Sequence, residues 1–508
     1  MRRKILSLAL AATAATTLTA VATVVTPSAS SASSASTAAT RTAPAATTPD
    51  SLRWTPCPPQ AAGSRSSVAS RLECATLGVP LDHRDPGGRQ IEIAVSRLAS
   101  ENPAKRRGVL LTNPGGPGAS GLDYPAQLAA AGLPKDVLDA YDVIGFDPRG
   151  VGRSTPVTCD LTPQQQARGN FPPYAHTAAD VAREAPNARA VAERCAASRT
   201  AWMLPYITTA NTARDMDRLR AALGETRISY LGASYGSYLG AVYTTLFPRQ
   251  SDRVVLDSNM GPGGYDLAAF RLLGRGMEDR FPDFAAYAAA HPEYQLGSTP
   301  RQVTAKFFEL AKRLDAEPVG GIDGTLFRGV TFDRLYVEGL LPQLAKDWQA
   351  LDKGEPLPAP PSIPENFLAA HFYLSCGDSR WPGAVADYQR NAAADRLKYP
   401  LLGGITGNIK PCAYWPDSRV EPPVRIGDRG PSNVLMVQNE RDPGTPLVGA
   451  LKLRRALGDR ATLVTVDQGG HGVYPFGRNT CAKSTVTAFL ADGRRPAHDR
   501  ACAAESHR

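Results

Sequence analysis

Ser234 is the residue of this 508-residue chain whose surroundings point most directly to chemistry. It is the centre of the pentapeptide Gly-Ala-Ser-Tyr-Gly at 232–236, which follows the apolar, β-branched run 228–231 and precedes a helical pattern at 237–247. On a tight turn between strand and helix, small flanking residues let the two elements approach and leave the serine hydroxyl exposed. The pattern therefore predicts a nucleophilic serine, and acyl transfer as its chemistry.

We expect His471 to act as the general base for Ser234. It lies in the segment Gln-Gly-Gly-His-Gly at 468–472, directly after the strand-like run 463–466, and the flanking glycines leave its ring free to reach a hydroxyl. The other six histidines lie in polar turns, in the C-terminal tail or in Pro- or Ala-rich stretches, except His371, which is the alternative base.

The acid that orients the histidine should lie between the serine and the histidine and just after a strand. The run 434–437 has the length and β-branched content of a buried strand, and Asp442 follows it in a loop with Gly and Pro. We assign the orienting acid to Asp442, with Glu440 as the second choice and Asp257, after an earlier strand, as the third. Thr445 is expected to cap the next helix, with the following proline at its first position.

The chain order Ser234, Asp442, His471 is that of the α/β hydrolases and differs from the orders of chymotrypsin and subtilisin. In such a triad the histidine takes the serine proton, the serine attacks a carbonyl to form an acyl-enzyme, and water then releases the acyl group. The aspartate holds the imidazole tautomer and stabilises its cation.

A Gly-rich segment at 113–121, Asn-Pro-Gly-Gly-Pro-Gly-Ala-Ser-Gly, follows the strand-like run 109–112. Its backbone N–H groups could bind the oxygen of a reacting carbonyl, and the expected donors are those of Gly116 and of Tyr235, the residue after the serine. The glycine spacing also fits the dinucleotide-binding fingerprint. Two points make that alternative the weaker one: a proline interrupts the fingerprint, and the protein is expected to be exported, away from cellular NAD.

A charged turn, Asp-Pro-Arg-Gly-Val-Gly-Arg-Ser, occupies 147–154 after the run 143–146. Arg149 could bind substrate there. We favour a structural role, in which the charges of the turn pair with one another beside the Gly-rich segment.

Short apolar runs alternate with helical patterns along much of the chain, which predicts a mostly parallel sheet. The expected strands are 91–95, 109–112, 143–146, 228–231, 254–256, 434–437 and 463–466. Between the fifth and sixth of these, helical patterns occur at 267–281, 303–314, 332–348 and 384–397. We therefore expect an α/β-hydrolase core over 50–260 and 425–508, with a largely helical cap inserted at 261–424.

The N-terminal region carries a targeting signal. Three basic residues at 2–4 precede an apolar run to about residue 25 and a stretch of small residues, which together predict a secretory signal peptide over 1–32. The Ala-, Ser-, Thr- and Pro-rich segment 33–49 contains too little apolar surface to fold and is expected to be a leader or pro-segment. We expect a secreted, extracellular protein without a stable membrane anchor.

Eight cysteines in an exported chain indicate disulfides. We expect near neighbours to pair as Cys57–Cys74, Cys159–Cys195, Cys376–Cys412 and Cys481–Cys502. The sequence contains no Cys-x-x-Cys pair and no His-Glu-x-x-His motif, so we expect neither a metal nor another cofactor.

The charge pattern argues against nucleic acid as a partner. The formal net charge is +9, but three positive charges lie at 2–4 and the remaining Lys and Arg are scattered among Asp and Glu. Nucleic-acid binding requires cations clustered along one face, so we expect no nucleic-acid partner.

The overall composition is that of an ordinary globular protein, with 43% hydrophobic and 21% charged residues.

Taken together, the motifs resemble those of the tripeptidyl aminopeptidases, secreted relatives of the prolyl aminopeptidases among the α/β-hydrolase peptidases. The matching segments are 113–118, 147–154, 232–236, 376–378 and 439–446, and the resemblance spans nearly all of the mature chain. It implies that the protein removes tripeptides from the free N-termini of peptide substrates, under a helical cap that restricts access.

An enzyme of this kind needs a carboxylate that receives the α-ammonium group of its substrate. Three extended residues span about 10 Å, so this carboxylate should lie that far from Ser234. The candidates are Glu440 from the acid loop and Asp378 and Glu365 from the cap.

Other functions remain open beside this one. A prolyl aminopeptidase that releases single residues, or a secreted esterase, would use the same triad. A binding protein could keep the fold and lose turnover, but a complete triad argues against it. The sequence carries no indication of the oligomeric state.

Overall fold

The computed structural model describes residues 52–58, 69–358 and 362–505, which belong to one compact unit, Thr48–Arg508. The expected signal peptide, 1–32, and leader, 33–49, lie outside the described residues. Among the helices that the structure describes, none is long and apolar enough to cross a membrane.

The described strands form a ten-stranded sheet in the order β1-β2-β3-β5-β4-β6-β7-β8-β9-β10. The pairs from β5 through β10 are parallel, and β1, β2 and β3 add an antiparallel edge. The bounds are β1 Thr55–Pro56, β2 Glu73–Pro80, β3 Gln90–Leu98, β4 Gly108–Asn113, β5 Tyr141–Phe146, β6 Ile228–Ala233, β7 Ser251–Asp257, β8 Val434–Arg441, β9 Ala461–Gly469 and β10 Arg500–Cys502. The seven expected strands are present as β3 to β9, and the prediction of a mostly parallel sheet is confirmed.

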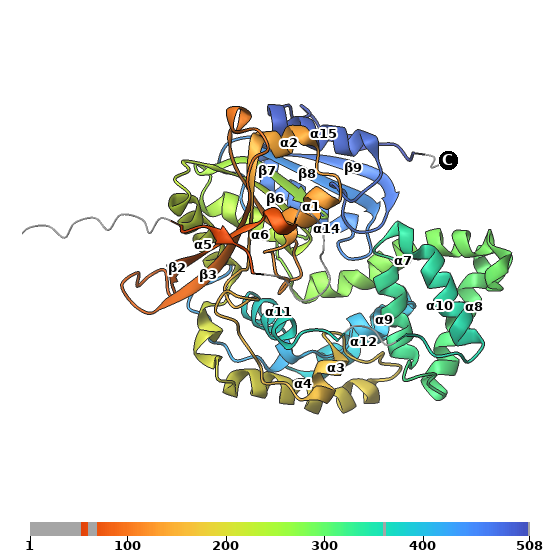
Figure 1. Ribbon diagram of the computed structural model, residues 1–508. Coiled ribbons are helices and arrows are strands. Elements are labelled where there is room, and N and C mark those ends of the chain that lie inside the picture. Colours follow the sequence, from red (N-terminus) through yellow and green to blue (C-terminus); the bar gives the residue numbers. More distant parts are fainter. Residues whose placement is uncertain (1–51, 59–68, 359–361, 506–508) are drawn as a thin grey trace, which may run out of the picture. The chain divides into compact units, whose positions relative to one another are not determined.

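Both faces of the sheet are covered by helices (Figure 1). One face packs against α1 Tyr124–Ala130, α2 Lys135–Ala140 and α15 Thr480–Asp492, and the other against α5 Thr209–Ala222, α6 Tyr235–Leu246 and α14 Leu447–Leu457. In strand β4, Leu110 packs on the face covered by α1, α2 and α15, whereas Val109 and Leu111 pack on the face covered by α5, α6 and α14. A strand buried on both faces needs apolar residues at every position.

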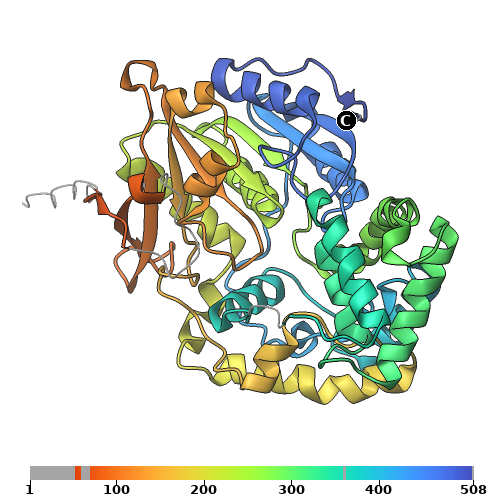
Figure 2. The same cartoon turned by 45° about the vertical axis from the view of Figure 1, so that its right-hand side comes forward.

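A second, helical layer is built from the chain between β7 and β8 (Figure 2). It contains α7 Leu267–Ala289, α8 Pro300–Ala316, α9 Gly324–Arg334, α10 Leu341–Asp352, α11 Glu365–Gly377, α12 Val385–Lys398 and the short α13 Gly403–Thr406. This layer has its own core, in which the rings of Phe281, Phe284, Phe307 and Trp348 pack together.

Two helices that precede β6 also join the helical layer. They are α3 Pro163–Arg168 and α4 Ala178–Ala197, and α4 packs against α12. The chain leading to α4 is fixed by backbone and side-chain hydrogen bonds, from Ala175 N–H to the Gly404 carbonyl (3.0 Å) and from the Asn408 amide to the Pro173 carbonyl (2.8 Å). The helical layer is therefore assembled from two separate stretches of the chain, of which the sequence pattern indicated one.

The expected helix at 332–348 is wrong in one respect, because the structure divides it. Helix α9 ends at Arg334, the short 3-10 helix η5 spans Glu338–Leu340, and α10 starts at Leu341 with a proline in its first turn. Proline cannot continue a preceding helix but is well placed at the start of a new one. The break matters because it turns Tyr336 toward the site described below.

The four expected cysteine pairs are confirmed. Cys57–Cys74, Cys159–Cys195, Cys376–Cys412 and Cys481–Cys502 are disulfides, and no free cysteine occurs among the described residues.

Candidate active site

Ser234 lies on the sharp turn between β6 and α6. Its φ of 60° is in the left-handed region, which a non-glycine residue adopts only where the surrounding structure enforces it. The flanking glycines are sterically required: a Cβ on Gly232 would lie 2.4 Å from the Gly236 carbonyl oxygen, and a Cβ on Gly236 would lie 2.6 Å from the Asn113 carbonyl oxygen. The geometry is that of a nucleophile elbow.

The Gly-rich segment passes directly beside this turn. Gly115 has a φ of 98°, and a Cβ there would lie 2.8 Å from Ser234 Cβ and 3.0 Å from the backbone nitrogen of Tyr235. The Asn113 side chain accepts a hydrogen bond from the Gly115 N–H (2.9 Å), which fixes the start of the loop. The structure thus brings the segment that carries Gly116 against Ser234, the expected nucleophile, and Tyr235, whose N–H is expected to bind the substrate carbonyl oxygen.

Asp442 and His471 are in direct contact. Both carboxylate oxygens of Asp442 lie within hydrogen-bond distance of His471 Nδ1, at 2.9 and 3.0 Å. Asp442 is fully buried, and its oxygens also accept from the N–H of Gly444 (2.8 Å) and from the N–H and hydroxyl of Thr445 (both 2.9 Å). The expectation that Thr445 caps the next helix is wrong: α14 begins after Pro446, and Thr445 instead holds the Asp442 carboxylate.

The pKa of His471 is set by two opposing effects. Burial lowers the pKa, but the charge of Asp442 and the hydrogen bond to it outweigh burial, and the net result is a pKa above the ordinary 6.5. Because 16% of the His471 side chain remains exposed, the ring can still be approached from the site. No hydrogen bond joins His471 to Ser234 in the structure, and in unliganded hydrolases such contacts commonly tighten only when substrate binds.

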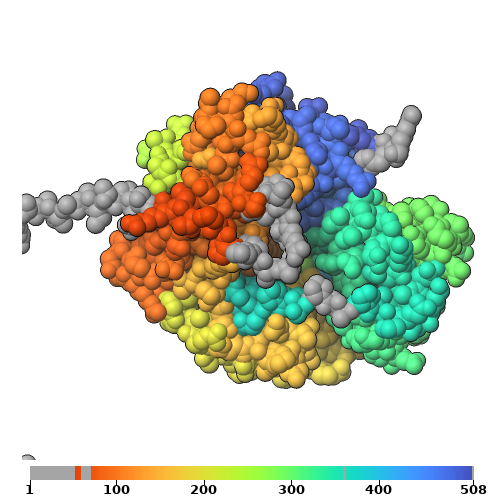
Figure 3. Space-filling model, in the orientation of Figure 1, coloured from red at the N-terminus to blue at the C-terminus, as the bar shows by residue number. Residues whose placement is uncertain are grey.

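Tyr336 is a site residue that the sequence pattern did not indicate. Its carbonyl accepts a hydrogen bond from the His471 N–H (2.7 Å), and the two rings pack with centroids 4.8 Å apart. Its hydroxyl lies so close to Gly444 that a Cβ there would be 2.5 Å away. Figure 3 shows that the teal part of the helical layer meets the blue C-terminal part of the chain at the surface.

Asp257, the third choice for the orienting acid, connects the serine turn to the histidine loop. Its backbone carbonyl accepts from the Ser234 N–H (3.0 Å), and its carboxylate accepts from the N–H groups of Val473 and Tyr474 at 2.7 to 3.0 Å. Burial raises its pKa to about 6, against the effect of these hydrogen bonds. Asp257 therefore binds the backbone that follows His471, whereas Asp442 contacts the imidazole itself.

His371, the alternative base, lies on α11 away from Asp442. Its Nδ1 is 3.3 Å from the Pro117 carbonyl oxygen, and burial lowers its pKa to about 3. An imidazole that is 1% exposed and has no acidic partner is poorly suited to proton transfer. The structure places it as a support for the Gly-rich loop.

The structure places the three candidate amine-binding carboxylates differently. Glu365 starts α11 and accepts a hydrogen bond from the Cys159 N–H (2.8 Å), and Asp378, at the end of α11, is engaged by Thr209. Glu440 is the penultimate residue of β8 and is half-buried, and no residue in the described part of the chain forms a hydrogen bond or ion pair with its carboxylate. Of the three, Glu440 is the one with neither carboxylate oxygen engaged by another described residue, whereas Glu365 accepts through Oε1 and Asp378 through both oxygens.

Arg149 is fully buried and has a structural set of partners. Its guanidinium forms a bidentate ion pair with Asp215 (2.6 and 2.7 Å) and donates to the carbonyls of Pro80, Leu81 and Tyr206. This burial agrees with a structural role for Arg149. Its partner, however, is Asp215 and not another charged residue of the turn 147–154. A guanidinium enclosed in this way has no donor left for a substrate.

A sheet of this topology, with a serine on the turn after β6 and an acid–histidine pair at the ends of β8 and β9, defines an α/β hydrolase of the serine type. Comparison with known proteins narrows the class. The chain is 35% identical over 453 residues to a tripeptidyl aminopeptidase of Streptomyces lividans, covering 85% of this chain and 84% of that protein. The chain belongs to the tripeptidyl aminopeptidase family.

Further similarities agree with this family. Residues 402–502 match the family model described as TAP-like protein. Carboxylesterase B of Mycobacterium tuberculosis is 31% identical over 463 residues, covering 86% of this chain and 88% of that protein. The serine protease Hip1 of the same organism is 27% identical over 482 residues, covering 89% of this chain and 91% of that protein.

Proposed function

We propose that this protein is a secreted serine exopeptidase that releases tripeptides from free peptide N-termini through an acyl-enzyme on Ser234. The observation that carries the proposal is the hydrogen-bonded pair of Asp442 and His471, which Asp257 connects to the serine turn. The similarity to the Streptomyces tripeptidyl aminopeptidase supports the choice of substrate.

In the proposed mechanism, neutral His471 accepts the Ser234 proton as the hydroxyl oxygen attacks the carbonyl carbon of the third peptide residue. The N–H groups of Gly116 and Tyr235 stabilise the negative oxygen that forms. The imidazolium, stabilised by Asp442, then protonates the departing amine, which breaks the peptide bond and leaves the tripeptide as an ester on Ser234. Water attacks this ester with His471 again as the base, and the tripeptide leaves.

We propose Glu440 as the carboxylate that binds the substrate α-ammonium group. It lies two residues before Asp442 at the end of β8, and within the described residues its oxygens are not engaged by another group. A partly buried carboxylate without a partner gains a charge-assisted hydrogen bond when an ammonium group arrives. Asp378 already accepts hydrogen bonds through both oxygens and Glu365 through one, which makes these two the weaker candidates.

Export of the protein is supported by two observations. Four disulfides are typical of proteins that fold in an oxidising compartment. The sequence at 2–32 has the basic, apolar and small-residue regions of a signal peptide, although it lies outside the described residues.

An esterase is the second candidate, because the chain is also 31% identical to a carboxylesterase. An esterase would use the same triad on an ester and would not require a free amine. A prolyl aminopeptidase differs from the proposal only in releasing one residue at a time.

Mass spectrometry of a peptide digest tests the proposal. Purified protein is incubated with a decapeptide that has a free N-terminus and with its N-acetylated form, and the products are identified by mass. The proposal expects successive tripeptides from the free peptide and little cleavage of the acetylated one, with no cleavage by the Ser234→Ala variant. Release of single residues, equal cleavage of both peptides, or cleavage of simple esters only would reject it.

A further inference from the structure

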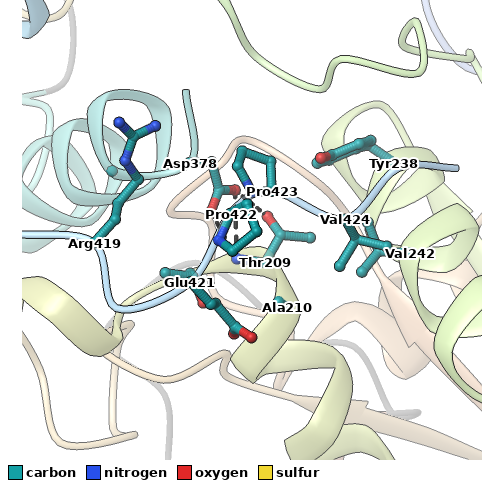
Figure 4. A pocket seen from close by; sticks show the side chains of 12 residues that line it. Thr209, Ala210, Tyr238, Val242, Asp378, Arg419, Glu421, Pro422, Pro423 and Val424 are labelled. Atoms are coloured by element: carbon teal, nitrogen blue, oxygen red, sulfur yellow. Dashed lines mark hydrogen bonds between the residues drawn. The ribbon is translucent and has the colours of Figure 1, made fainter. Parts of the chain in front are cut away.

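Asp378 joins the helical layer to the first residue of α5. It follows the last residue of α11, and its carboxylate accepts hydrogen bonds from the N–H of Thr209 at 3.0 and 3.3 Å and bonds the Thr209 hydroxyl as well (Figure 4). Arg419 and Glu421 line the same pocket (Figure 4), but neither forms an ion pair or hydrogen bond with Asp378. They pair instead with Asp417 and Arg214. Among the described residues, Asp378 is thus held by hydrogen bonds and not by an ion pair.

The Thr209 hydroxyl extends this contact to Tyr235. The two hydroxyl oxygens are 2.5 Å apart, and the Tyr235 side chain is buried at 2% exposure. A hydroxyl has a single proton to donate. When Asp378 is ionised, Thr209 must give its proton to the carboxylate, and it therefore accepts the proton of Tyr235. The result is a directed chain from Tyr235 through Thr209 to Asp378, in which each hydrogen bond polarises the next.

Tyr235 is the residue whose backbone N–H would stabilise the reacting oxygen. It is the first residue of α6 and follows Ser234, whose φ of 60° leaves the turn dependent on its surroundings. Anchoring the phenol at the far end of the side chain fixes the ring, and with it the first turn of α6. A donor of this kind is effective only when it is held in place before the charge develops.

The same helix α11 also contacts the loop that carries the second donor. A Cβ on Gly118 would lie 2.6 Å from the Phe367 carbonyl oxygen and 3.1 Å from the His371 nitrogen, so the loop is packed tightly on the helix. His371 Nδ1 approaches the Pro117 carbonyl, next to Gly116. One helix of the helical layer therefore supports the segments of both expected donors.

We propose that Asp378 is a positioning residue of the oxyanion hole, which holds Tyr235 through the Thr209 hydroxyl and so couples α11 to the donor beside Ser234. The inference rests on the proposed roles of Ser234 and Tyr235, but not on the identity of the substrate. It assigns to Asp378 a task different from amine binding, and it gives the helical layer a part in the chemical step besides covering the site.

The test measures how fast a fluorophosphonate reacts with Ser234, since this probe reports on the nucleophile and the oxyanion donors without requiring a peptide. Thr209→Val keeps the shape of the side chain and its N–H but removes the hydroxyl, and Tyr235→Phe removes the phenol proton. Asp378→Asn leaves one acceptor oxygen, whereas Thr209 donates to both oxygens of Asp378. We expect each to lower the second-order rate constant by about tenfold, less than the loss of a whole oxyanion donor. With a peptide substrate, kcat should fall by the same factor while KM changes little.

Conservative and control variants separate positioning from general stability. Thr209→Ser retains the hydroxyl and should react like the wild type. Tyr238→Phe, on the next turn of α6 in the same pocket, should also do so, because its hydroxyl takes part in no hydrogen bond among the described residues. The double variant Thr209→Val/Tyr235→Phe should be no slower than the slower single variant, because both changes interrupt the same chain.

The outcomes distinguish this inference from the proposed function. If Ser234 is not labelled in the wild type, or Ser234→Ala is labelled equally, the proposed nucleophile is wrong. If Ser234 is labelled and Asp378→Asn and Thr209→Val react as fast as the wild type, the positioning role is overturned. The same conclusion follows if these variants unfold at lower temperature and lose labelling only in proportion to the unfolded fraction, or if the two single effects add fully in the double variant.

Discussion

Asp442 and His471 come from the ends of the neighbouring parallel strands β8 and β9, and the Asp442 carboxylate faces the His471 Nδ1 with both oxygens at 2.9 and 3.0 Å. Parallel strands end at the same edge of a sheet, so two residues 29 positions apart in the chain become partners. The contact fixes the imidazole so that Nδ1 carries the proton and Nε2 is available as a base.

The pKa of His471 should define the acid limb of the activity profile. His471 accepts a proton only in its neutral form, and Asp442 raises its pKa above 6.5 despite burial. We therefore expect kcat/KM to fall as the pH drops through a value above 6.5 and to be restored above it, as measured with a tripeptidyl amide from pH 5 to 9. A profile without an acid limb in this range would contradict the assignment of His471.

Removing the charge of Asp442 should reduce turnover severely. We expect Asp442→Asn to lower kcat by about 10⁴-fold, because the amide favours the wrong tautomer and no longer stabilises the imidazolium. Asp467→Asn is the matched control, since Asp467 lies on β9 close to His471 in sequence but forms its ion pair with Arg441 at the surface. Equal losses in the two variants would indicate a general electrostatic effect instead of a specific partner for His471.

Asp257 should make stability depend on pH. Its pKa rises from 3.8 to about 6 on folding, so its contribution to the free energy of unfolding is fully present below pH 3.8 and is lost as the pH rises through 6. The shift corresponds to about 3 kcal/mol between these limits. In Asp257→Asn this component is absent, and urea unfolding from pH 4 to 7.5 should show a flatter profile than the wild type. Parallel profiles for the two proteins would rule out this role of Asp257.

Glu440 should be responsible for the preference for a free amine. We expect Glu440→Gln to lower kcat/KM for a substrate with a free N-terminus by about 10- to 100-fold, the worth of a charge-assisted hydrogen bond, and to leave the slow cleavage of the N-acetylated substrate unchanged. Asp333→Asn serves for comparison, because this carboxylate on α9 is 76% exposed and lies three residues before Tyr336. If Asp333→Asn removes the preference and Glu440→Gln does not, the amine site lies on α9.

Tyr336 should contribute through its ring. Tyr336→Phe keeps the packing on His471 and should retain most of kcat, whereas Tyr336→Ala should lower kcat by about tenfold by leaving the imidazole less well held. In both variants the backbone bond from the His471 N–H to residue 336 can persist. Steady-state kinetics of the two variants would show whether the ring matters, and equal activity in Tyr336→Ala and the wild type would show that it does not.

Most of the sheet and the positions of the site residues along the chain could be predicted from the sequence. A strand buried on both faces requires a short apolar run, such as 109–112. The turn around Ser234 requires two glycines, because a side chain at either position would clash with the backbone. These signals are local, because the steric requirement and the residues that meet it lie within a few positions of each other. The cysteine pairs were predictable for a different reason: each cysteine bonds to the next one along the chain, 17 to 36 residues away.

The tertiary structure alone decided which side chains meet at the site. Tyr336 contacts His471 across 135 positions because a break between α9 and α10 turns it there, and Asp378 meets Thr209 across 169 positions at the junction of the two layers. From the sequence, Asp257, Glu365 and Asp378 were equally plausible carboxylates for catalysis or binding. Their hydrogen-bond partners in the structure distinguish their roles. Such contacts depend on how distant elements pack, and no periodicity or motif within one segment contains that information.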